Sequence, residues 1–281
     1  MLAQTTLGFL GAGAMAEALI RGVLAAGLVA PDRIWVTNRS NRERLESLAR
    51  RFGVRTTPRK AEVVAAADLL VVACKPKDVP DLLAEVGRLT RPGQVLLSVA
   101  AGVPTRRFLD EVTPGVQVVR AMPNTSCLVR ESATAICGAP GTGPEALALA
   151  RELLGAVGRV VEVPEDLMDA VTGLSGSGPA YVYLMVEAME QAGVQVGLDS
   201  RVARELAVQT LLGAARMLVE TGADPAVLRQ QVTSPGGTTM AGLQVLREMG
   251  FAEALARAVA RAAERSRELG ALVAAPQATG G

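Results

Sequence analysis

The stretch Thr6–Ala16, TLGFLGAGAMA, decides the fold of the first half of the chain. Its apolar start is typical of a buried strand, and the residues from Met15 onward have the spacing of an amphipathic helix. Between them, Gly11, Gly13 and Ala16 form the pattern G-x-G-x-x-A, whose glycines allow a tight turn and the close approach of a pyrophosphate. Glycines also mark ordinary turns, but this position between a strand and a helix favours a dinucleotide-binding βαβ unit.

The alternation of strand and helix continues to about residue 163. Short apolar runs bounded by helical patterns are typical of buried parallel strands. We therefore predict an α/β fold that begins with a Rossmann domain, residues 1–163, built on a doubly wound, mostly parallel sheet. The expected strands are Thr6–Leu10, Arg33–Thr37, Leu69–Ala73, Val95–Val99, Gln117–Ala121, Ala133–Cys137 and Arg159–Val163, and the expected helices are Met15–Ala26, Asn41–Arg51, Lys77–Arg88, Pro104–Glu111 and Pro144–Gly155.

After Pro164 the pattern becomes entirely helical. We predict an all-α domain, residues 164–281, with a tail, 274–281, that frays. Aromatic residues make up only 2% of the chain, and the Ala- and Leu-rich helices are too apolar for one small solvated bundle. We therefore expect this half to form a dimer interface. Its expected helices are Ala180–Ala192, Ser200–Thr221, Pro225–Gln231, Thr239–Met249 and Glu253–Leu269.

The composition argues against several classes of partner. The 29 basic and 28 acidic residues leave a net charge of +1, which offers no field for nucleic acid or an anionic membrane. No apolar run is long enough to span a bilayer, and the N-terminus lacks the basic segment of a signal peptide. The three cysteines have no metal-ligand spacing, and the chain has no His. We expect a small-molecule ligand, no bound metal and a reduced, cytoplasmic setting.

The end of the second expected strand bears on the choice of cofactor. NAD-binding proteins place Asp or Glu there to bind the ribose 2′-hydroxyl. This chain has Asn38, Arg39 and Ser40 instead. Arg39 can pair with a 2′-phosphate and its neighbours can donate hydrogen bonds to it, although a solvated turn before a helix is the plainer alternative. We predict NADPH as the preferred cofactor and NADH as a less efficient substitute, with their ratio left open.

The end of the third expected strand, Ala73-Cys74-Lys75-Pro76, should border the same crevice. The carboxyl ends of parallel strands line the nucleotide site in folds of this kind. Lys75 can approach the cofactor there, although a Lys at a strand end is often only solvated. Cys74 is expected to be a small buried residue and not a nucleophile.

Two glycine-rich segments of the helical half each precede a long helix. One is residues 172–181, TGLSGSGPAY, and the other is residues 233–239, TSPGGTT. A flexible loop with a capping hydroxyl would explain either segment. In the second, however, backbone amides and the hydroxyls of Ser234, Thr238 and Thr239 meet at one helix start. That arrangement suits a small carboxylate.

Six segments of the chain are similar to those of one known family, pyrroline-5-carboxylate reductase. The resemblance extends over nearly the whole chain, and its last two segments are the most specific. It implies an NADPH-dependent reductase that dimerises through interleaved C-terminal helices and often assembles into decamers. The segments are Gly8–Ala16, Lys75-Pro76, Ser98–Val103, Met122–Thr125, Asp169–Tyr181 and Ser234–Thr239.

The resemblance also implies the residues of the two binding sites. Taken with the motifs above, it gives substrate contacts from Glu165, Ser234, Gly237, Thr238 and Thr239. The cofactor contacts are Leu10, Gly11, Ala12, Gly13, Ala14, Met15, Asn38, Arg39, Ser40, Ala73, Cys74, Lys75, Pro76, Ala100 and Ala101.

The implied reaction transfers a hydride to the C=N carbon of 1-pyrroline-5-carboxylate and yields L-proline, the last step of proline biosynthesis. With no His, the chain lacks one common acid of ketone-reducing dehydrogenases. An imine can be reduced as its iminium, so a neutral hydroxyl near the nitrogen suffices, and positioning supplies most of the catalysis. We expect Thr239 to be that catalytic hydroxyl and the amides of residues 237–239 to hold the carboxylate. The alternative is that Thr239 only caps a helix.

Two other functions remain to be weighed. An oxidoreductase like the β-hydroxyacid dehydrogenases would share the plan of a Rossmann domain followed by helices. It would need a catalytic Lys in the helical half, and no Lys follows Lys77. A non-catalytic dinucleotide-binding protein would keep the glycine pattern but would have no need of the segment Ser234–Thr239.

Overall fold

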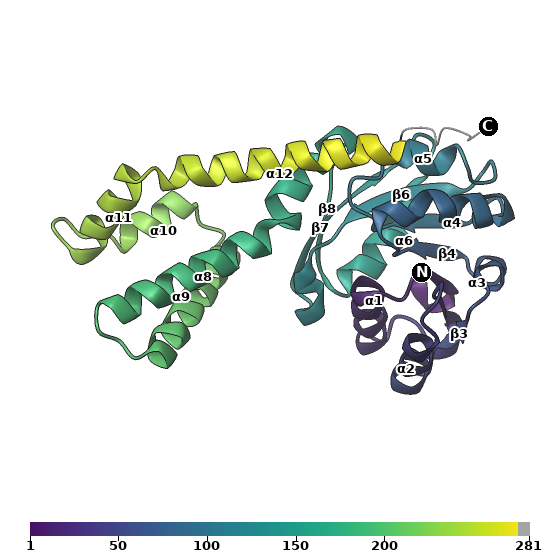
Figure 1. Ribbon diagram of the computed structural model, residues 1–281, viewed down its shortest axis with the longest axis horizontal. Helices are drawn as coiled ribbons and strands as arrows, with labels where there is room; N and C mark the ends of the chain where they lie inside the picture. The colour runs from purple at the N-terminus through teal and green to yellow at the C-terminus, as the bar shows by residue number, and fades with distance from the viewer. Residues whose placement is uncertain (275–281) are drawn as a thin grey trace. The chain divides into compact units, whose positions relative to one another are not determined.

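The computed structural model describes residues 1–274 and divides into two compact units (Figure 1). The first unit contains Met1–Ser177 together with the described residues from Ala260 onward, and the second is Gly178–Val259. The expected frayed tail, 274–281, lies outside the described residues except for its first position.

The first unit is built on one sheet of eight strands in the order β3-β2-β1-β4-β5-β6-β7-β8. Neighbouring strands are parallel except β6 and β7, so the last two strands run opposite to the first six. The predicted doubly wound, mostly parallel sheet is confirmed, and only β3 was not expected. The strands are β1 Leu7–Leu10, β2 Ile34–Thr37, β3 Arg55–Thr57, β4 Leu69–Val72, β5 Val95–Ser98, β6 Gln117–Met122, β7 Ser132–Gly138 and β8 Gly158–Glu162.

Two hydrophobic cores lie on the two faces of this sheet. Successive strand residues point to opposite faces, so Leu7 and Phe9 of β1 join the core with α1, α2 and α6, whereas Leu10 joins the core with α3, α4 and α5. The helices therefore cover both faces of the sheet, as Figure 1 shows. They are α1 Ala14–Ala25, α2 Arg42–Phe52, α3 Lys60–Ala66, α4 Val79–Val86, α5 Thr105–Leu109 and α6 Pro144–Gly155.

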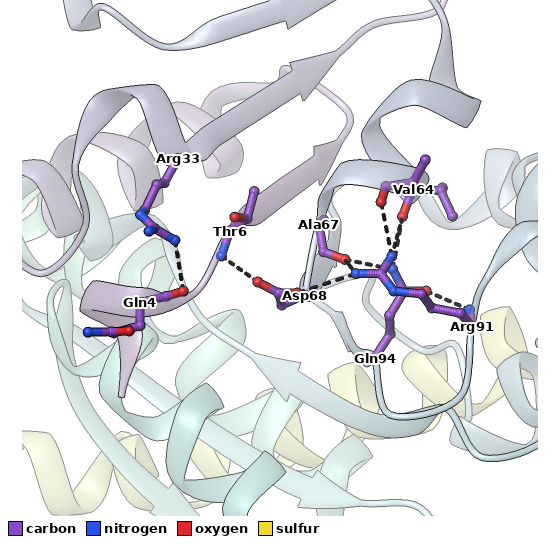
Figure 2. A network of polar contacts seen from close by, with 9 residues as sticks. Gln4, Thr6, Arg33, Val64, Ala67, Asp68, Arg91 and Gln94 are labelled. Carbon is purple, nitrogen blue, oxygen red and sulfur yellow. Dashed lines mark hydrogen bonds and ion pairs between the residues drawn. The ribbon is translucent and has the colours of Figure 1, made fainter.

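A polar network at the amino ends of β1, β4 and β5 provides hydrogen-bond donors for the last carbonyls of the short helix α3 (Figure 2). The last carbonyls of a helix have no partner within it. Here the Arg91 guanidinium donates to the carbonyls of Val64 at 3.3 Å and Ala67 at 2.9 Å. The Gln94 amide donates to the same two carbonyls at 2.8 and 2.7 Å. The sequence pattern did not predict α3, whose C-terminal partners come from a distant segment.

The glycine-rich segment that begins at Thr172 is helical and not a flexible loop. Thr172–Gly176 forms a turn of π-helix, and α8 begins at Gly178. The Asn124 amide donates to the carbonyl of Ser175 at 2.9 Å, and a Cβ on Gly176 would lie 2.5 Å from Cε of Met122. Two of the motifs that resemble the reductase family therefore pack against each other.

The C-terminal helix α12, Phe251–Ala274, contributes its later residues to the first unit. The hydroxyl of Ser266 donates to Oδ1 of Asp169 at 2.6 Å. Four residues further on, a Cβ on Gly270 would lie 2.4 Å from the carbonyl oxygen of Gly102, so the two backbones approach closely. The first unit is thus completed by a segment from the far end of the chain.

The second unit consists of helices alone, as predicted, and no strand follows β8 among the described residues. A Cβ on Gly193 would lie 2.9 Å from Cβ of Ala203, so α8 and α9 approach closely through small residues. These helices leave much apolar surface bare: Leu184 is 65% exposed and Met249 79% exposed. Within residues 178–259, only Ala203 and Ala207 are buried. The elements are α8 Gly178–Gln195, α9 Ser200–Thr221, α10 Pro225–Gln231, α11 Thr238–Glu248 and the first part of α12.

Candidate functional site

A cavity of about 580 Å³ opens at the carboxyl ends of β1, β2 and β4. Parallel strands present their carboxyl ends at one edge of the sheet, and this edge is where folds of this kind bind nucleotides. Most of the predicted cofactor residues lie in its wall. The lining contains Leu10, Gly11, Ala12, Gly13, Asn38, Arg39, Ser40, Ala73, Cys74 and Lys75 from the sequence prediction, together with Thr37, Lys60, Lys77, Asp78, Asp81, Leu82 and Glu85.

Five predicted cofactor residues do not line this cavity. Ala14 and Met15 begin α1, and Pro76 follows the wall residue Lys75. Ala100 and Ala101 follow β5, the strand next to β4. Their predicted contacts with the cofactor stay predictions.

The backbone of the glycine pattern forms the tight turn that a dinucleotide-binding site requires. Gly11 has φ +123°, and a Cβ there would lie 2.7 Å from the carbonyl oxygen of Ala73, so only glycine suits this turn. The N–H of Gly11 donates to the carbonyl of Thr37 at 3.1 Å, which ties the turn to β2. In the wall of the cavity, Oγ1 of Thr37 is buried with no hydrogen-bond partner. A buried hydroxyl without a partner is costly and gives a bound ligand a site for a hydrogen bond.

Arg44 of α2 contacts the glycine turn and is not a wall residue of the cavity. Its Nε donates to the carbonyl of Ala12 at 2.9 Å, and its guanidinium also pairs with Glu17 in the first turn of α1. Arg51 pairs with the same carboxylate at 2.6 Å. Burial raises the pKa of Glu17, but the hydrogen bonds and charges of the two arginines outweigh it and leave that pKa lowered. Glu17 is therefore neutralised by ion pairing at the helix end that faces the predicted pyrophosphate site.

The segment Asn38–Ser40 forms a turn whose backbone is held by Asn38. Its Oδ1 accepts from the N–H of Ser40 at 3.1 Å and of Asn41 at 3.0 Å. Arg39 therefore extends from an ordered turn, and its side chain is 74% exposed. Its Nη1 lies 3.9 Å from Oδ2 of Asp81. The cation predicted to bind a 2′-phosphate is thus mostly exposed, and its ion pair with Asp81 is long.

Cys74 is not prepared for nucleophilic chemistry. Burial, with a smaller contribution from the charge of Asp78, raises the pKa of its thiol to about 11. The thiolate is the reactive form of cysteine. At neutral pH the side chain is a thiol, as expected of a residue that is not a nucleophile, but it is half-buried where a buried residue was predicted.

Glu165, the predicted substrate contact of the first unit, is held by a set of polar groups. Its carboxylate accepts from the N–H and the hydroxyl of Thr105 at 2.7 and 2.6 Å. Arg120, whose side chain is 5% exposed, lies 3.5 Å from Glu165 and 3.7 Å from Asp169. One buried cation therefore faces two carboxylates, and the position of Glu165 is fixed.

The second glycine-rich segment connects α10 to α11 in the second unit. Gly237 is the N-cap residue of α11, and no side chain makes a capping hydrogen bond there. Its N–H donates to the carbonyl of Ser234 at 3.1 Å, and a Cβ on it would lie 2.4 Å from Oγ of Ser234. Thr238 and Thr239 are the first two helical residues, where N–H groups lack partners within the helix. Thr239 thus lies beyond the cap position, which removes support from the capping alternative.

Within residues 1–274, no cluster of three or more His, Cys, Asp or Glu residues has an arrangement that could hold a metal ion. In the same range, no helix combines the length and apolar character needed to cross a membrane.

Comparison with known families matches both halves of the chain. Residues 165–269 match the model of pyrroline-5-carboxylate reductase dimerisation, and residues 6–102 match that of NADP oxidoreductase, coenzyme F420-dependent. The dimerisation match covers the helices with bare apolar surface and indicates an oligomer.

Relatives and solved structures give the same result. Pyrroline-5-carboxylate reductase 1 of Bacillus spizizenii is 43% identical over 95% of this chain and 90% of its own length. The reductase of Methanosarcina acetivorans is 43% identical over 94% of this chain and 97% of its own. The structure of the Coxiella burnetii reductase superposes with a TM-score of 0.89 at 37% identity, covering 94% of this chain and 98% of that one. The Plasmodium falciparum enzyme with NADP bound gives 0.85 at 27% identity, covering 96% and 100%. The chain belongs to the pyrroline-5-carboxylate reductase family.

Proposed function

We propose that this protein reduces 1-pyrroline-5-carboxylate to L-proline with NADPH, as the last step of proline biosynthesis in the cytoplasm. The observation that carries the proposal is the combination of a nucleotide cavity in the first unit with the family-specific segment Ser234–Thr239 in the second. Residues 1–163 act as the NADP-binding domain and residues 164–281 as the substrate-binding and dimerisation domain.

The cofactor residues act mainly through the backbone. The turn around Gly11 lets the pyrophosphate approach the start of α1, whose N–H groups and dipole favour an anion. Arg39 accounts for the preference for NADPH over NADH, because a guanidinium can form paired hydrogen bonds with a 2′-phosphate. Bound NADPH supplies the hydride that reduces the C=N carbon.

The substrate residues hold a small anion that carries a cationic nitrogen. The unpaired N–H groups at the start of α11 suit the carboxylate of the substrate. Since the N–H of Gly237 already donates to Ser234, this role falls to the amides of Thr238 and Thr239. Glu165, held in place by Thr105, adds a fixed negative charge that favours the iminium form.

Thr239 is the proposed catalytic hydroxyl. In the iminium form, the proton that the product needs is already on the nitrogen, so no strongly acidic side chain is required. The hydroxyl of Thr239 accepts that N–H as a hydrogen bond and fixes which ring face meets the hydride. This explains how the chain acts without a His.

The competing functions have less support. A β-hydroxyacid dehydrogenase would need a Lys in the helical half, where the sequence has none. A non-catalytic binding protein gives no reason for the hydroxyls of residues 234–239. The decisive measurement follows the NADPH concentration in two reactions: its consumption with pyrroline-5-carboxylate, and its formation from NADP with a β-hydroxyacid. Turnover with the imine supports the proposal, and turnover with the hydroxyacid alone, or with neither, contradicts it.

The assembly is proposed to be a homodimer, with a decamer of five dimers as its higher form. Almost every side chain of the second unit is at least partly exposed, including Leu184, Val219 and Met249. Apolar surface on this scale is typical of an interface between subunits. Light scattering coupled to gel filtration at micromolar concentration measures the mass directly, and a monodisperse monomer would refute the proposal.

A further inference from the structure

The nucleotide cavity is lined by more charge than the binding of one phosphate requires. Its walls carry four cations and three carboxylates, a net charge of +1. All three carboxylates come from the segment that leads into and forms α4, and none comes from the end of β2, where NAD-binding proteins place their acid. The cations are Arg39, Lys60, Lys75 and Lys77, and the carboxylates are Asp78, Asp81 and Glu85.

Two of the cations are paired with the same face of α4. Asp81 and Glu85 are four residues apart and therefore lie on one side of the helix. Asp81 is 3.9 Å from Arg39, and Glu85 pairs with Lys60. The two pairs differ in exposure, since the side chain of Arg39 is 74% exposed and that of Lys60 only 18%.

We propose that Asp81 and Glu85 limit the preference of this site for NADPH by competing with its 2′-phosphate for Arg39 and Lys60. A phosphate monoester carries a charge of about −1.5 to −2 at neutral pH. To bind Arg39 and Lys60, it must either displace the two carboxylates from these cations or bind close to their negative charges. NADH has a hydroxyl at the same position, and a nearby carboxylate can accept a hydrogen bond from it. The acids of α4 therefore penalise NADPH and leave NADH unaffected or favoured.

The size of the effect follows from the exposure of these pairs. A solvent-exposed ion pair changes an equilibrium by about twofold to fivefold. Replacing Asp81 with Asn should thus tighten the binding of a 2′-phosphate by that factor, and adding Glu85→Gln should tighten it further. Because the effect is electrostatic, it should shrink in about 1 M salt, where the Debye length is about 3 Å.

The inference rests on the cofactor role of the cavity and not on the imine chemistry, so its test uses fragments of the cofactor. Dissociation constants of 2′,5′-ADP and 5′-AMP are measured by calorimetry for the full-length protein and for Asp81→Asn, Glu85→Gln and the double variant. Glu46→Gln is the matched control: Glu46 pairs with Arg50 at 3.6 Å, the two are 65% and 73% exposed, and Glu46 is not a wall residue of this cavity.

The expected result is tighter binding of 2′,5′-ADP by the Asp81 and Glu85 variants, with 5′-AMP unchanged or weaker and no change in Glu46→Gln. The ratio of kcat/KM for NADPH to that for NADH should rise in parallel. Unchanged or weaker binding of 2′,5′-ADP would overturn the inference, because it would mean that the carboxylates only orient Arg39 and Lys60. Absence of imine reduction would refute the proposed function, whereas the fragment affinities would still decide this point.

Discussion

Replacing Arg44 with Ala should weaken the binding of NADPH and NADH alike. Arg44 donates a hydrogen bond to the carbonyl of Ala12 in the glycine turn at 2.9 Å and forms an ion pair with Glu17. Its side chain is 27% exposed, so these contacts are partly shielded from water. A hydrogen bond to a charged group contributes about 1.5–3 kcal/mol. Since the turn is also held by the bond from Gly11 to Thr37, only part of that energy should reach the cofactor.

We expect the dissociation constants of both cofactors to rise about threefold to tenfold, because a tenfold change corresponds to about 1.4 kcal/mol. The quenching of protein fluorescence or the enhancement of NADPH fluorescence on titration measures both constants. Arg50→Ala removes an arginine of the same helix whose partner, Glu46, lies in α2 itself, and serves as the control. Arg44→Lys keeps the charge but cannot reach both partners, so it should recover only part of the affinity. A loss confined to NADPH, or unchanged affinities, would refute the role of Arg44 as a clamp on the turn.

Three further predictions follow from the other parts of the site. Arg39→Ala should raise the KM for NADPH severalfold or more, at about 1.5–3 kcal/mol for a charge-assisted contact, and leave the KM for NADH nearly unchanged; equal losses would indicate a structural role. Thr239→Ala should lower turnover about tenfold or more with little change in NADPH affinity, whereas Thr239→Ser should retain most of it; near-normal turnover of Thr239→Ala would exclude a catalytic hydroxyl. The lowered pKa of Glu17 should stabilise the fold at neutral pH, and this contribution should be lost as pH falls below the ordinary Glu value of 4.5; urea unfolding of Glu17→Gln should therefore show a weaker dependence on pH than the parent, and parallel curves would contradict the assignment.

The sequence predicts those elements whose ends are marked by capping residues or whose apolar pattern matches their burial in the fold. Helix α9, predicted and found at Ser200–Thr221, has Asp199 as its N-cap and Gly222 as its C-cap. Strands β1 and β4, at the centre of the sheet, are apolar on both faces, and both were expected. Helix α3 was missed because its N-cap residue, Arg59, makes no capping bond. Its C-terminal carbonyls are satisfied instead by Arg91 and Gln94, which no local pattern reveals.

The candidate site divides in the same way. Three short segments were predicted to contact the cofactor: Gly11–Gly13, Asn38–Ser40 and Ala73–Lys75. The structure places all three in the wall of the cavity. Thr37 could have been found as the last residue of the predicted second strand. Lys60 could not, because it belongs to the unpredicted α3. Asp81 and Glu85 lie on a predicted helix. The helical pattern alone does not show that this helix borders the cavity, because that depends on the order of the strands in the sheet.

The network around Arg120 also constrains the order in which the chain can acquire its structure. Arg120 and Asp169 are synthesised well before Ser266, which donates to Asp169 and follows it by 97 residues. Domains generally fold in the order of their synthesis, but this first unit lacks one of its own packing elements until α12 has left the ribosome. A nascent chain paused before residue 260 would therefore leave the backbone at Gly102 and the carboxylate of Asp169 without their contacts to α12.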